Sequence, residues 1–375
     1  MFGKLVRSQK PLQAAVIAAL LFPVNASAEW GLNLPPPSTS IASRILDLHN
    51  AIMLICLIIF IVVFGVMFYS LYAHRKSRGH KAHQFSHNSK LEVVWTIIPF
   101  IILVGMAIPS TATLLFMEDT TESDLTVKIT GYQWKWEYEY LDHDIAFFSN
   151  LSTPRAQIEN REPKTENYLL EVDKPMVIPA NRKVRILLTS NDVIHAWWIP
   201  KFGVKKDAIP GYINEIWVNV DEPGTYRGQC AELCGKDHAF MPIVAEVLAA
   251  EDFDAWVDDQ KGVQMASAQE ADRSWTMDEL MVRGEQVYIN CIACHGDKGQ
   301  GVPPAFPPLT ASPITTGAIE DHINIVMKGK ANTTMIGFEQ QLSDADIAAV
   351  ITYERNALGN SVGDLVQPSE IKALR

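Results

Sequence analysis

The chain has 375 residues, a formal net charge of −11 at pH 7 and only five cysteines. This length is enough for two or more domains, and five cysteines are too few for a disulfide-dense scaffold. The acidic balance, without a basic tract, argues against a nucleic-acid partner.

Residues 1–28 have the pattern of a secretory signal peptide. Basic residues up to Lys10 precede an apolar run from Leu12 to about Pro23, and small residues end the segment at Ala28, where we expect cleavage. An uncleaved membrane helix is the alternative, but the run is well short of the ~20 residues that a bilayer requires. Export places the rest of the chain in a compartment where exposed thiols tend to oxidise.

Residues 29–120 are predicted to form a transmembrane hairpin. Two apolar segments, about 45–73 and 92–117, are long enough to span a bilayer. The loop between them is basic and has no acid, whereas several acids follow the second segment. By the positive-inside rule the loop is cytoplasmic, and the chain from about residue 118 onward lies on the outer side.

Glu92 lies at the expected cytoplasmic end of the second apolar segment. An ionisable residue at a membrane boundary is either a functional group or a solvated interfacial carboxylate. Its position alone does not choose between these two interpretations.

Residues 121–257 are predicted to form an all-β domain, an antiparallel sandwich or barrel. Short runs such as LTVKITGYQWKWEYEYL and RKVRILLTSND alternate with period two, are rich in β-branched and aromatic residues, and are separated by turn residues. Residues 258–274 lose this periodicity and become polar, so they are predicted to be a linker.

Residues 275–375 are predicted to form a helical domain. Thr276 with Glu279, and Ser343 with Asp346, have the spacing of helix-capping boxes. Residues 344–356 then repeat apolar side chains at helical spacing.

The sequence CIACH, from Cys291 through Cys294 to His295, has the C-x-x-C-H spacing of covalent haem attachment. Two thioethers can anchor haem c, and the next residue is then the proximal iron ligand. A thioredoxin-like dithiol and half of a zinc site are the alternatives. Neither is favoured, because no βαβ pattern surrounds the motif and no second cysteine pair follows it.

The sixth iron ligand has to come from elsewhere in the helical domain. Met335 lies in a glycine-flanked loop just before the last predicted long helix, where a side chain can reach the distal face. Met327 belongs to an apolar helical run and is expected in the core. His322 is the other candidate, and we expect it to be a partly exposed surface residue. We therefore favour Met335.

A second group of soft ligands lies in CAELCGKDHAFM, residues 230–241, with His195 upstream in VIHAWW. A disulfide, a zinc site and copper are the competing interpretations. A disulfide has no use for His238, and zinc has no use for Met241. One cysteine with two histidines and an axial Met would make a mononuclear copper site. Two thiolates can instead bridge two coppers, and this spacing favours the binuclear form.

The segments GYQWKWEYEY, VIHAWWIPKFGVKKDAIPG and YRGQCAELCGKDHAFMPI, after a hairpin containing LEVVWTIIP, strongly resemble cytochrome c oxidase subunit II. The CIACHG module is similar to the fused cytochrome c of bacterial caa-type oxidases. The resemblance covers nearly the whole mature chain. It implies a cupredoxin-like sandwich followed by a class I cytochrome c domain.

The resemblance implies a ligand set for a binuclear CuA centre. The residues that match it are His195, Cys230, Cys234, His238 and Met241, with the backbone carbonyl of Glu232. The side chain of Glu232 is similar to a ligand of the magnesium shared with subunit I, and Asp207 matches an acid near that metal.

Two further roles rest on the resemblance. Trp134 falls where the family has the tryptophan that accepts electrons, although without the resemblance a strand aromatic in the core would be the favoured interpretation. Glu92 aligns with the carboxylate at the mouth of the K-type proton channel, which agrees with its expected cytoplasmic position.

The implied function is subunit II of a proton-pumping cytochrome c oxidase in the bacterial inner membrane. Electrons would arrive at the tethered haem c, pass to CuA and continue to subunit I, where oxygen is reduced to water. The implied partners are subunits I and III, membrane lipid and an electron donor. The expected donor is a soluble or membrane-bound cytochrome c or a bc complex.

Two other functions compete with this one. An electron-transfer protein of another terminal reductase, such as nitrous oxide reductase, would be soluble, which the hairpin and Glu92 disfavour. A zinc- or disulfide-stapled assembly scaffold would leave CIACH unexplained. Quinol-oxidase relatives of subunit II lack the copper ligands, which are all present here.

Overall fold

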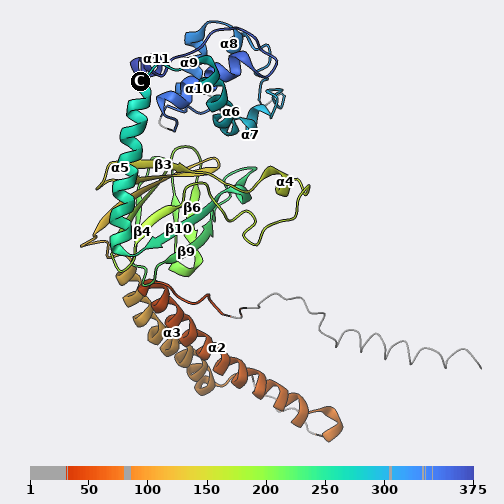
Figure 1. Ribbon diagram of the computed structural model, residues 1–375. Helices are drawn as coiled ribbons and strands as arrows, with labels where there is room; N and C mark the ends of the chain where they lie inside the picture. The colour runs from red at the N-terminus through yellow and green to blue at the C-terminus, as the bar shows by residue number, and fades with distance from the viewer. Residues whose placement is uncertain are drawn as a thin grey trace, which may run out of the picture. The chain divides into compact units, whose positions relative to one another are not determined.

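The computed structural model describes residues 31, 33–79, 86–303, 306–331, 333, 335–339 and 341–375. Within these residues the chain forms a helical hairpin, a β-sandwich and a helical domain, in that order (Figure 1). This architecture confirms the predicted fold class. The predicted signal peptide, residues 1–28, lies outside the described residues.

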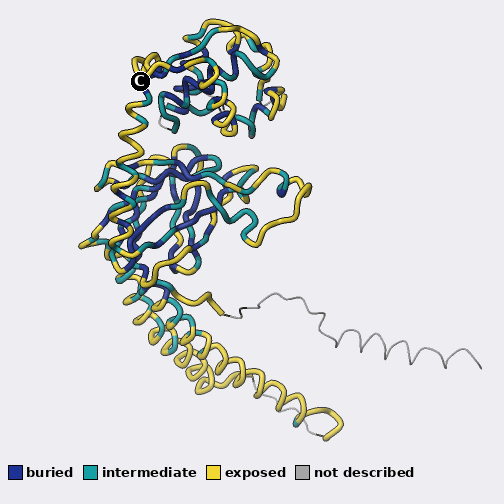
Figure 2. Tube along the Cα trace, viewed as in Figure 1, coloured by how far each residue is buried: buried dark blue, intermediate teal, exposed yellow. Residues whose placement is uncertain are grey.

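The hairpin consists of α2 (Ser40–Ala73) and α3 (Ser89–Met117), with the short helix η1 (Lys76–Arg78) after the first. Both helices begin a few residues before the expected 45 and 92. Their 34 and 29 residues have mean hydropathies of 3.3 and 2.3 over the most apolar window, and those windows are unburied. Figure 2 shows them exposed along most of their length, as helices that face lipid would be.

Each hairpin helix begins at a side-chain cap. Thr39 Oγ1 accepts a hydrogen bond from the backbone N–H of Ala42 at 3.0 Å, and it donates to the carbonyl of Phe202 at 2.7 Å. Asn88 Oδ1 accepts from the N–H of Leu91 at 3.2 Å. These bonds satisfy amide groups that a helix start leaves unpaired.

The sandwich is built from strands β1 to β10 in three sheets. Their bounds are β1 Leu125–Tyr132, β2 Lys135–Tyr140, β3 Ile145–Ser149, β4 Met176–Pro179, β5 Val184–Ser190, β6 His195–Ile199, β7 Val204–Ala208, β8 Asn214–Val218, β9 Gly224–Gln229 and β10 Pro242–Leu248. The strand orders are β3-β2-β1-β5-β8, β4-β10-β9 and β6-β7. The short helices α4 (Arg155–Ile158), η2 (Pro200–Phe202) and η3 (His238–Phe240) lie in the connections.

The expectation of a purely antiparallel domain was wrong in two places. Strand β1 pairs in parallel with β5, and β4 pairs in parallel with β10. Period-two alternation reports which face of a strand is buried, and it carries no information about the direction of the neighbouring strand.

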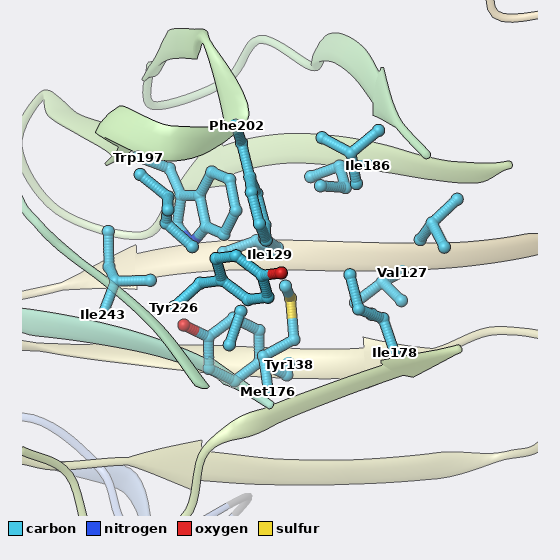
Figure 3. Close-up of a cluster of buried hydrophobic side chains, with 14 of the residues drawn as sticks. Val127, Ile129, Tyr138, Met176, Ile178, Ile186, Trp197, Phe202, Tyr226 and Ile243 are labelled. Carbon is cyan, nitrogen blue, oxygen red and sulfur yellow. The ribbon is translucent and has the colours of Figure 1, made fainter. Parts of the chain in front are cut away.

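Alternate side chains from the sheets meet in one apolar core (Figure 3). Ile129 of β1, Trp197 of β6 and Ile243 of β10 are fully buried in it. The same hydrophobic cluster contains Cys230 and Met241. The soft ligands of the 230–241 loop therefore extend the sandwich core, where water is scarce.

The segment predicted to be a linker, residues 258–274, is largely helical. It lies mostly inside α5 (Ala250–Asp272). Phe253 and Val257, near the start of the helix, are buried in the sandwich cluster. Near its end, Glu270 pairs with Arg283 of the helical domain at 2.7 Å. Its exposed middle is mostly polar, and the apolar residues there do not recur at helical spacing, so it has no amphipathic pattern for sequence analysis to find.

The helical domain is formed by α6 (Met277–Val287), α7 (Ile289–His295), α8 (Pro313–Thr316), α9 (Ile319–Lys328), α10 (Asp344–Asn356) and α11 (Pro368–Leu374). Helices α6 and α10 cross closely at Gly284. A Cβ atom on Gly284 would lie 2.2 Å from the carbonyl oxygen of Ala349, so only glycine allows this approach. Both predicted capping boxes, Thr276–Glu279 and Ser343–Asp346, are present.

Candidate copper and haem sites

The 230–241 loop is the hairpin connection between β9 and β10. Gln229 pairs with Pro242 across the two strands, and the N–H of Cys230 donates to the carbonyl of Met241 at 3.0 Å. The loop is therefore closed at its base, and its first and last residues are held next to each other. His195, the first residue of β6, is brought to the same place from another sheet.

The soft ligands converge around the two thiols. Cys230 Sγ lies 3.8 Å from Cys234 Sγ and 3.9 Å from His195 Nδ1. Cys234 Sγ lies 3.4 Å from His238 Nδ1 and 4.0 Å from Met241 Sδ. Each thiol thus has its own imidazole, and the thioether adjoins one of the two.

The backbone supplies one more group. The carbonyl oxygen of Glu232 lies 3.3 Å from Cys230 Sγ, on the thiol that has no methionine beside it. With metal bonds of about 2.3 Å to sulfur and 2.0 Å to nitrogen, tetrahedral ligands lie about 3.5–3.8 Å apart. The observed separations are close to that range, so the donors lie close enough together to share bound metal.

The two cysteines are separate thiols and not a disulfide. Their Sγ–Sγ distance of 3.8 Å is nearly twice a disulfide bond of about 2.05 Å. Among the residues that the structure describes, His195, Cys230 and Cys234 form the one group of three potential ligands with all ligand atoms within 4.8 Å of one another.

The neighbours of the two thiols shift their pKa values in opposite directions. Burial alone would raise the pKa of Cys230, but its contacts with His195 and nearby N–H groups outweigh burial and lower it. Burial, reinforced by the nearby Cys230, raises the pKa of Cys234 to about 12. Without metal, a proton therefore stays on Cys234 at neutral pH.

The ring of His195 is fixed from two sides. Its Nε2 lies 2.8 Å from Asp192 Oδ1, which leaves Nδ1 facing the thiols. The ring of Trp136 packs edge-on against it at a centroid distance of 5.8 Å. A Cβ atom on Gly131 would lie 2.8 Å from His195 Cδ2, so this glycine leaves the space that the imidazole occupies.

Asp192 and His195 also shift each other's pKa. Burial is the largest single effect on each group and opposes its charge. It is outweighed by several contacts together: the hydrogen bond between the two side chains, backbone N–H donors to the carboxylate, and Cys230 beside the imidazole. The pKa of Asp192 is lowered and that of His195 is raised. A carboxylate that accepts from the outer nitrogen of a histidine is a common support for a metal ligand.

Trp134 lies in the two-residue turn between β1 and β2, beside the copper loop. Its Nε1 donates to the carbonyl of Cys234 at 3.2 Å, and Gln133 Nε2 donates to the same oxygen at 2.7 Å. The side chain is half-buried, so it adjoins both the ligand loop and the surface. Trp134 is therefore not the core aromatic that its strand pattern alone would favour.

Glu232 and Asp207, the two acids expected near a magnesium ion, are not gathered into a ligand cluster as the copper ligands are. The side chain of Glu232 is exposed, and Asp207 is half-buried on β7, paired in register with Ala196. Ala196 accepts a backbone hydrogen bond from Ala231, which places the two acids on neighbouring segments. No metal-ligand group that includes them occurs among the described residues.

The CIACH motif lies entirely within α7 and forms its C-terminal part. Cys291 and Cys294 are half-buried free thiols three positions apart on the helix, so they share one face. The buried His295 points Nδ1 at the carbonyl oxygen of Pro307, 2.9 Å away. With Nδ1 protonated, Nε2 is left as the metal-binding nitrogen, which fits a proximal haem ligand.

The structure gives the three candidates for the sixth haem ligand different surroundings. Met335 is half-buried in a loop and packs against the hydrophobic cluster that also contacts Cys291. Met327 is 1% exposed in the core, as expected. His322 was expected to be partly exposed, which is wrong, since it is also 1% exposed. Its Nε2 lies 2.9 Å from the buried Glu354, so this nitrogen is already in use.

Glu92 lies in the first turn of α3, where a carboxylate is favoured by the helix dipole. Its Oε1 accepts from the N–H of Asn88 at 3.4 Å. The residue therefore has a structural role at the helix start, and the structure brings it near none of the copper or haem ligands.

Sequence reasoning missed Asp192 and Gln133. Neither is a metal ligand or an aromatic, and each acts through its hydrogen bonds to residues that the motif search did find. An acid three residues before a ligand histidine is a signal that could have pointed to Asp192, because histidine ligands are usually oriented by a carboxylate or carbonyl.

Three segments of the chain match known families. Residues 27–113 match the family described as cytochrome C oxidase subunit II, transmembrane domain, and residues 125–248 match its periplasmic domain. Residues 279–353 match cytochrome C oxidase, cbb3-type, subunit III.

Individual proteins also match the chain. A probable cytochrome c oxidase subunit 2 of Rickettsia felis is 40% identical over 250 residues, which cover 66% of this chain and 78% of that protein. Cytochrome c oxidase subunit 2 of Cereibacter sphaeroides is 38% identical over 245 residues, 62% of this chain and 81% of its own. The solved periplasmic domain of subunit II of cytochrome oxidase of Bradyrhizobium japonicum is 44% identical, covers 38% of this chain and 97% of its own, and has a TM-score of 0.35.

Proposed function

Because the chain belongs to the cytochrome c oxidase subunit II family, part of an oxidoreductase complex, we propose that it is the subunit that accepts electrons for a proton-pumping oxidase. The observation that carries this proposal is the convergence of two thiols, two imidazoles and a thioether. Each of these donor atoms lies within 4.0 Å of at least one other. A disulfide or a zinc site would not use this whole donor set.

The copper ligands proposed are His195, Cys230, Cys234, His238 and Met241, with the carbonyl of Glu232. When bound, a binuclear copper pair supplies rapid one-electron exchange with little rearrangement, because one charge is shared over two metals. The chain itself supplies two thiols that would bind metal as thiolates, a fixed imidazole at His195 and a buried setting that keeps water from the metals.

The haem proposed is a haem c attached through Cys291 and Cys294. His295 would bind the iron through Nε2, and the carbonyl of Pro307 holds the other ring nitrogen. Met335 is the proposed sixth ligand. A methionine at that position raises the potential relative to a second histidine, which suits a carrier that passes electrons on.

Trp134 is the proposed point at which electrons reach the copper loop. Its indole bonds directly to the carbonyl of Cys234, one of the two proposed bridging ligands. Electrons would then pass to subunit I, where oxygen is reduced. The donor to the tethered haem is a soluble or membrane-bound cytochrome c or a bc complex.

The placement proposed is the bacterial inner membrane, with the copper and haem domains on the outer side. Two helices long and apolar enough to span a bilayer, and a basic loop between them, support it. Subunit III is a further proposed partner. Glu232 and Asp207 would contribute to a magnesium site at the contact with subunit I, and Glu92 to the mouth of a proton channel.

The test is metal and haem content of the complete chain, purified in detergent. We expect two coppers per chain and one haem that stays attached after denaturation. A Cys230→Ser, Cys234→Ser double variant should lose both coppers and keep the haem. One zinc per chain in place of copper, or no bound metal after copper loading, would contradict the proposed function.

A further inference from the structure

Asp192 lies in the short loop between β5 and β6, three residues before the proposed copper ligand His195. Its side chain is 22% exposed. One carboxylate oxygen, Oδ1, lies 2.8 Å from His195 Nε2. The other, Oδ2, accepts a hydrogen bond from the backbone N–H of Gln133 at 2.7 Å. The two oxygens therefore hold two different parts of the site.

The loop keeps this carboxylate in one orientation. Oδ1 also accepts from the N–H of Val193 at 2.6 Å, and Ser190 Oγ lies 3.4 Å from the same oxygen. The Ser190 hydroxyl accepts in turn from the N–H of Asp192 at 3.2 Å. A side chain with this many local bonds has little freedom to rotate, so it can act as a fixed support.

The bond to His195 determines which ring nitrogen is free. With Nε2 protonated and donating to Asp192, the lone pair is on Nδ1, and Nδ1 is the nitrogen 3.9 Å from Cys230 Sγ. The carboxylate thus selects the tautomer that can bind metal and fixes the plane of the ring.

The bond to Gln133 fixes the turn that carries Trp134. That turn is also tied to the copper loop, because Gln133 Nε2 and Trp134 Nε1 both donate to the carbonyl of Cys234. Asp192 adds a third hydrogen bond to this turn, at the backbone N–H of Gln133. The position of the Trp134 indole is consequently fixed with respect to both His195 and Cys234.

We propose that Asp192 is a positioning residue that links the orientation of the copper ligand His195 to that of the electron-accepting turn at Trp134. This inference rests on the proposed function. Its distinctive consequence is that the two oxygens have separable effects: Oδ1 acts on the copper site, and Oδ2 acts on electron transfer to it.

Two substitutions separate these effects in the complete, metal-loaded oxidase. Asp192→Asn keeps an oxygen that can accept from His195, but it replaces the acceptor facing the N–H of Gln133 with a donor. Asp192→Ala removes both acceptors. Asp124→Asn is the matched control, because Asp124 Oδ2 likewise accepts a backbone N–H, that of Lys183, at 2.8 Å, and it bonds to no proposed copper ligand.

The measurements are the copper resonance spectrum, copper affinity, and the rate at which flash-reduced haem c is reoxidised by copper. For Asp192→Asn we expect a copper spectrum close to that of the unsubstituted protein and a transfer rate roughly tenfold lower, since small misplacements have large effects on rate. For Asp192→Ala we expect an altered spectrum and about 10–100-fold weaker copper binding. Asp124→Asn should change none of these.

A Trp134→Phe variant keeps this inference distinguishable from the proposed function. If Trp134→Phe is slow while Asp192→Asn transfers at the normal rate, the inference is overturned and the proposed function stands. An unaltered copper spectrum in Asp192→Ala overturns the role assigned to Oδ1. If the unsubstituted protein has no binuclear copper signal, the proposed function itself fails.

Discussion

Gly131 leaves the space in which the ring of His195 lies, and a methyl group there would come within 2.8 Å of the imidazole. We expect Gly131→Ala to displace the ring, to lower the free energy of unfolding by about 1–3 kcal/mol, and to weaken copper binding. The measurement is copper affinity by competition together with the visible spectrum. Gly262→Ala, where a Cβ atom meets nothing within 4 Å, is the control. Normal copper binding by Gly131→Ala would show that the site has room to adjust.

Copper uptake should depend on pH because of Cys234. Its pKa of about 12 means that the metal-free thiol is protonated at neutral pH, and metal binding has to displace that proton. Affinity should therefore rise with pH, by up to about tenfold per unit for each proton released. A competition titration with a copper chelator between pH 6 and pH 8 measures this. Affinity that is constant or falls over this range would refute the assignment of Cys234 as a thiolate ligand.

At this scale the sequence identified the candidate ligands more readily than the residues that support them. Residues such as Cys230 and His295 are identifiable because metal chemistry requires those side chains at those spacings. Asp192 acts through a tertiary hydrogen bond, and aspartate is common in loops, so its type and position carried little signal. The burial of His322 depends on Glu354, 32 positions away, which no local pattern encodes.

At the scale of elements, the start of α6 shows a cap that the sequence predicted. Thr276 Oγ1 accepts from the N–H of Glu279 at 3.3 Å, and Glu279 Oε2 accepts from the N–H of Thr276 at 2.8 Å. We expect Thr276→Ala to destabilise the haem-loaded protein by about 1 kcal/mol. Urea unfolding followed by circular dichroism measures it, with Ser369→Ala as the control. No difference between the two variants would contradict the capping role.

The same capping box should make the stability of the folded protein depend on pH. The hydrogen bond from the N–H of Thr276, and then Arg273, lower the pKa of Glu279 to about 2. A folded-state pKa below the unfolded value stabilises the fold above about pH 4.5, and this contribution is lost as pH falls through about 2. The stability difference between Glu279→Gln and the unsubstituted protein should therefore disappear in that window. A difference that persists at pH 2 would contradict the assignment.

The positions of the strands were largely predictable, but the way the strands pair was not, and one long helix was missed. The alternation in residues 125–132 identified β1, yet its parallel partner β5 begins about fifty residues further along the chain. Helix α5 was missed because apolar residues do not recur at helical spacing in its exposed middle, and helix formation there depends on packing at the two ends.

For the whole molecule, the two cofactor sites belong to separate domains. The proposed copper ligands come from β6 and the β9–β10 loop, and the haem cysteines come from α7. We expect a Cys291→Ser, Cys294→Ser double variant to lose covalent haem and to keep the copper spectrum unchanged. Haem staining of a denaturing gel, with copper resonance on the same sample, checks this. Loss of bound copper in that variant would mean that the sites are not independent.

The most direct test of the binuclear copper centre is electron paramagnetic resonance of the copper in the complete, haem-containing protein. A bridging pair of thiolates predicts a signal split by two equivalent copper nuclei, because one unpaired electron is shared between both metals. A signal from a single copper nucleus, or no copper signal with zinc bound, would contradict it. The chain would then be a membrane-tethered cytochrome, and the ligand cluster in its β-sandwich would have a function other than binuclear copper binding.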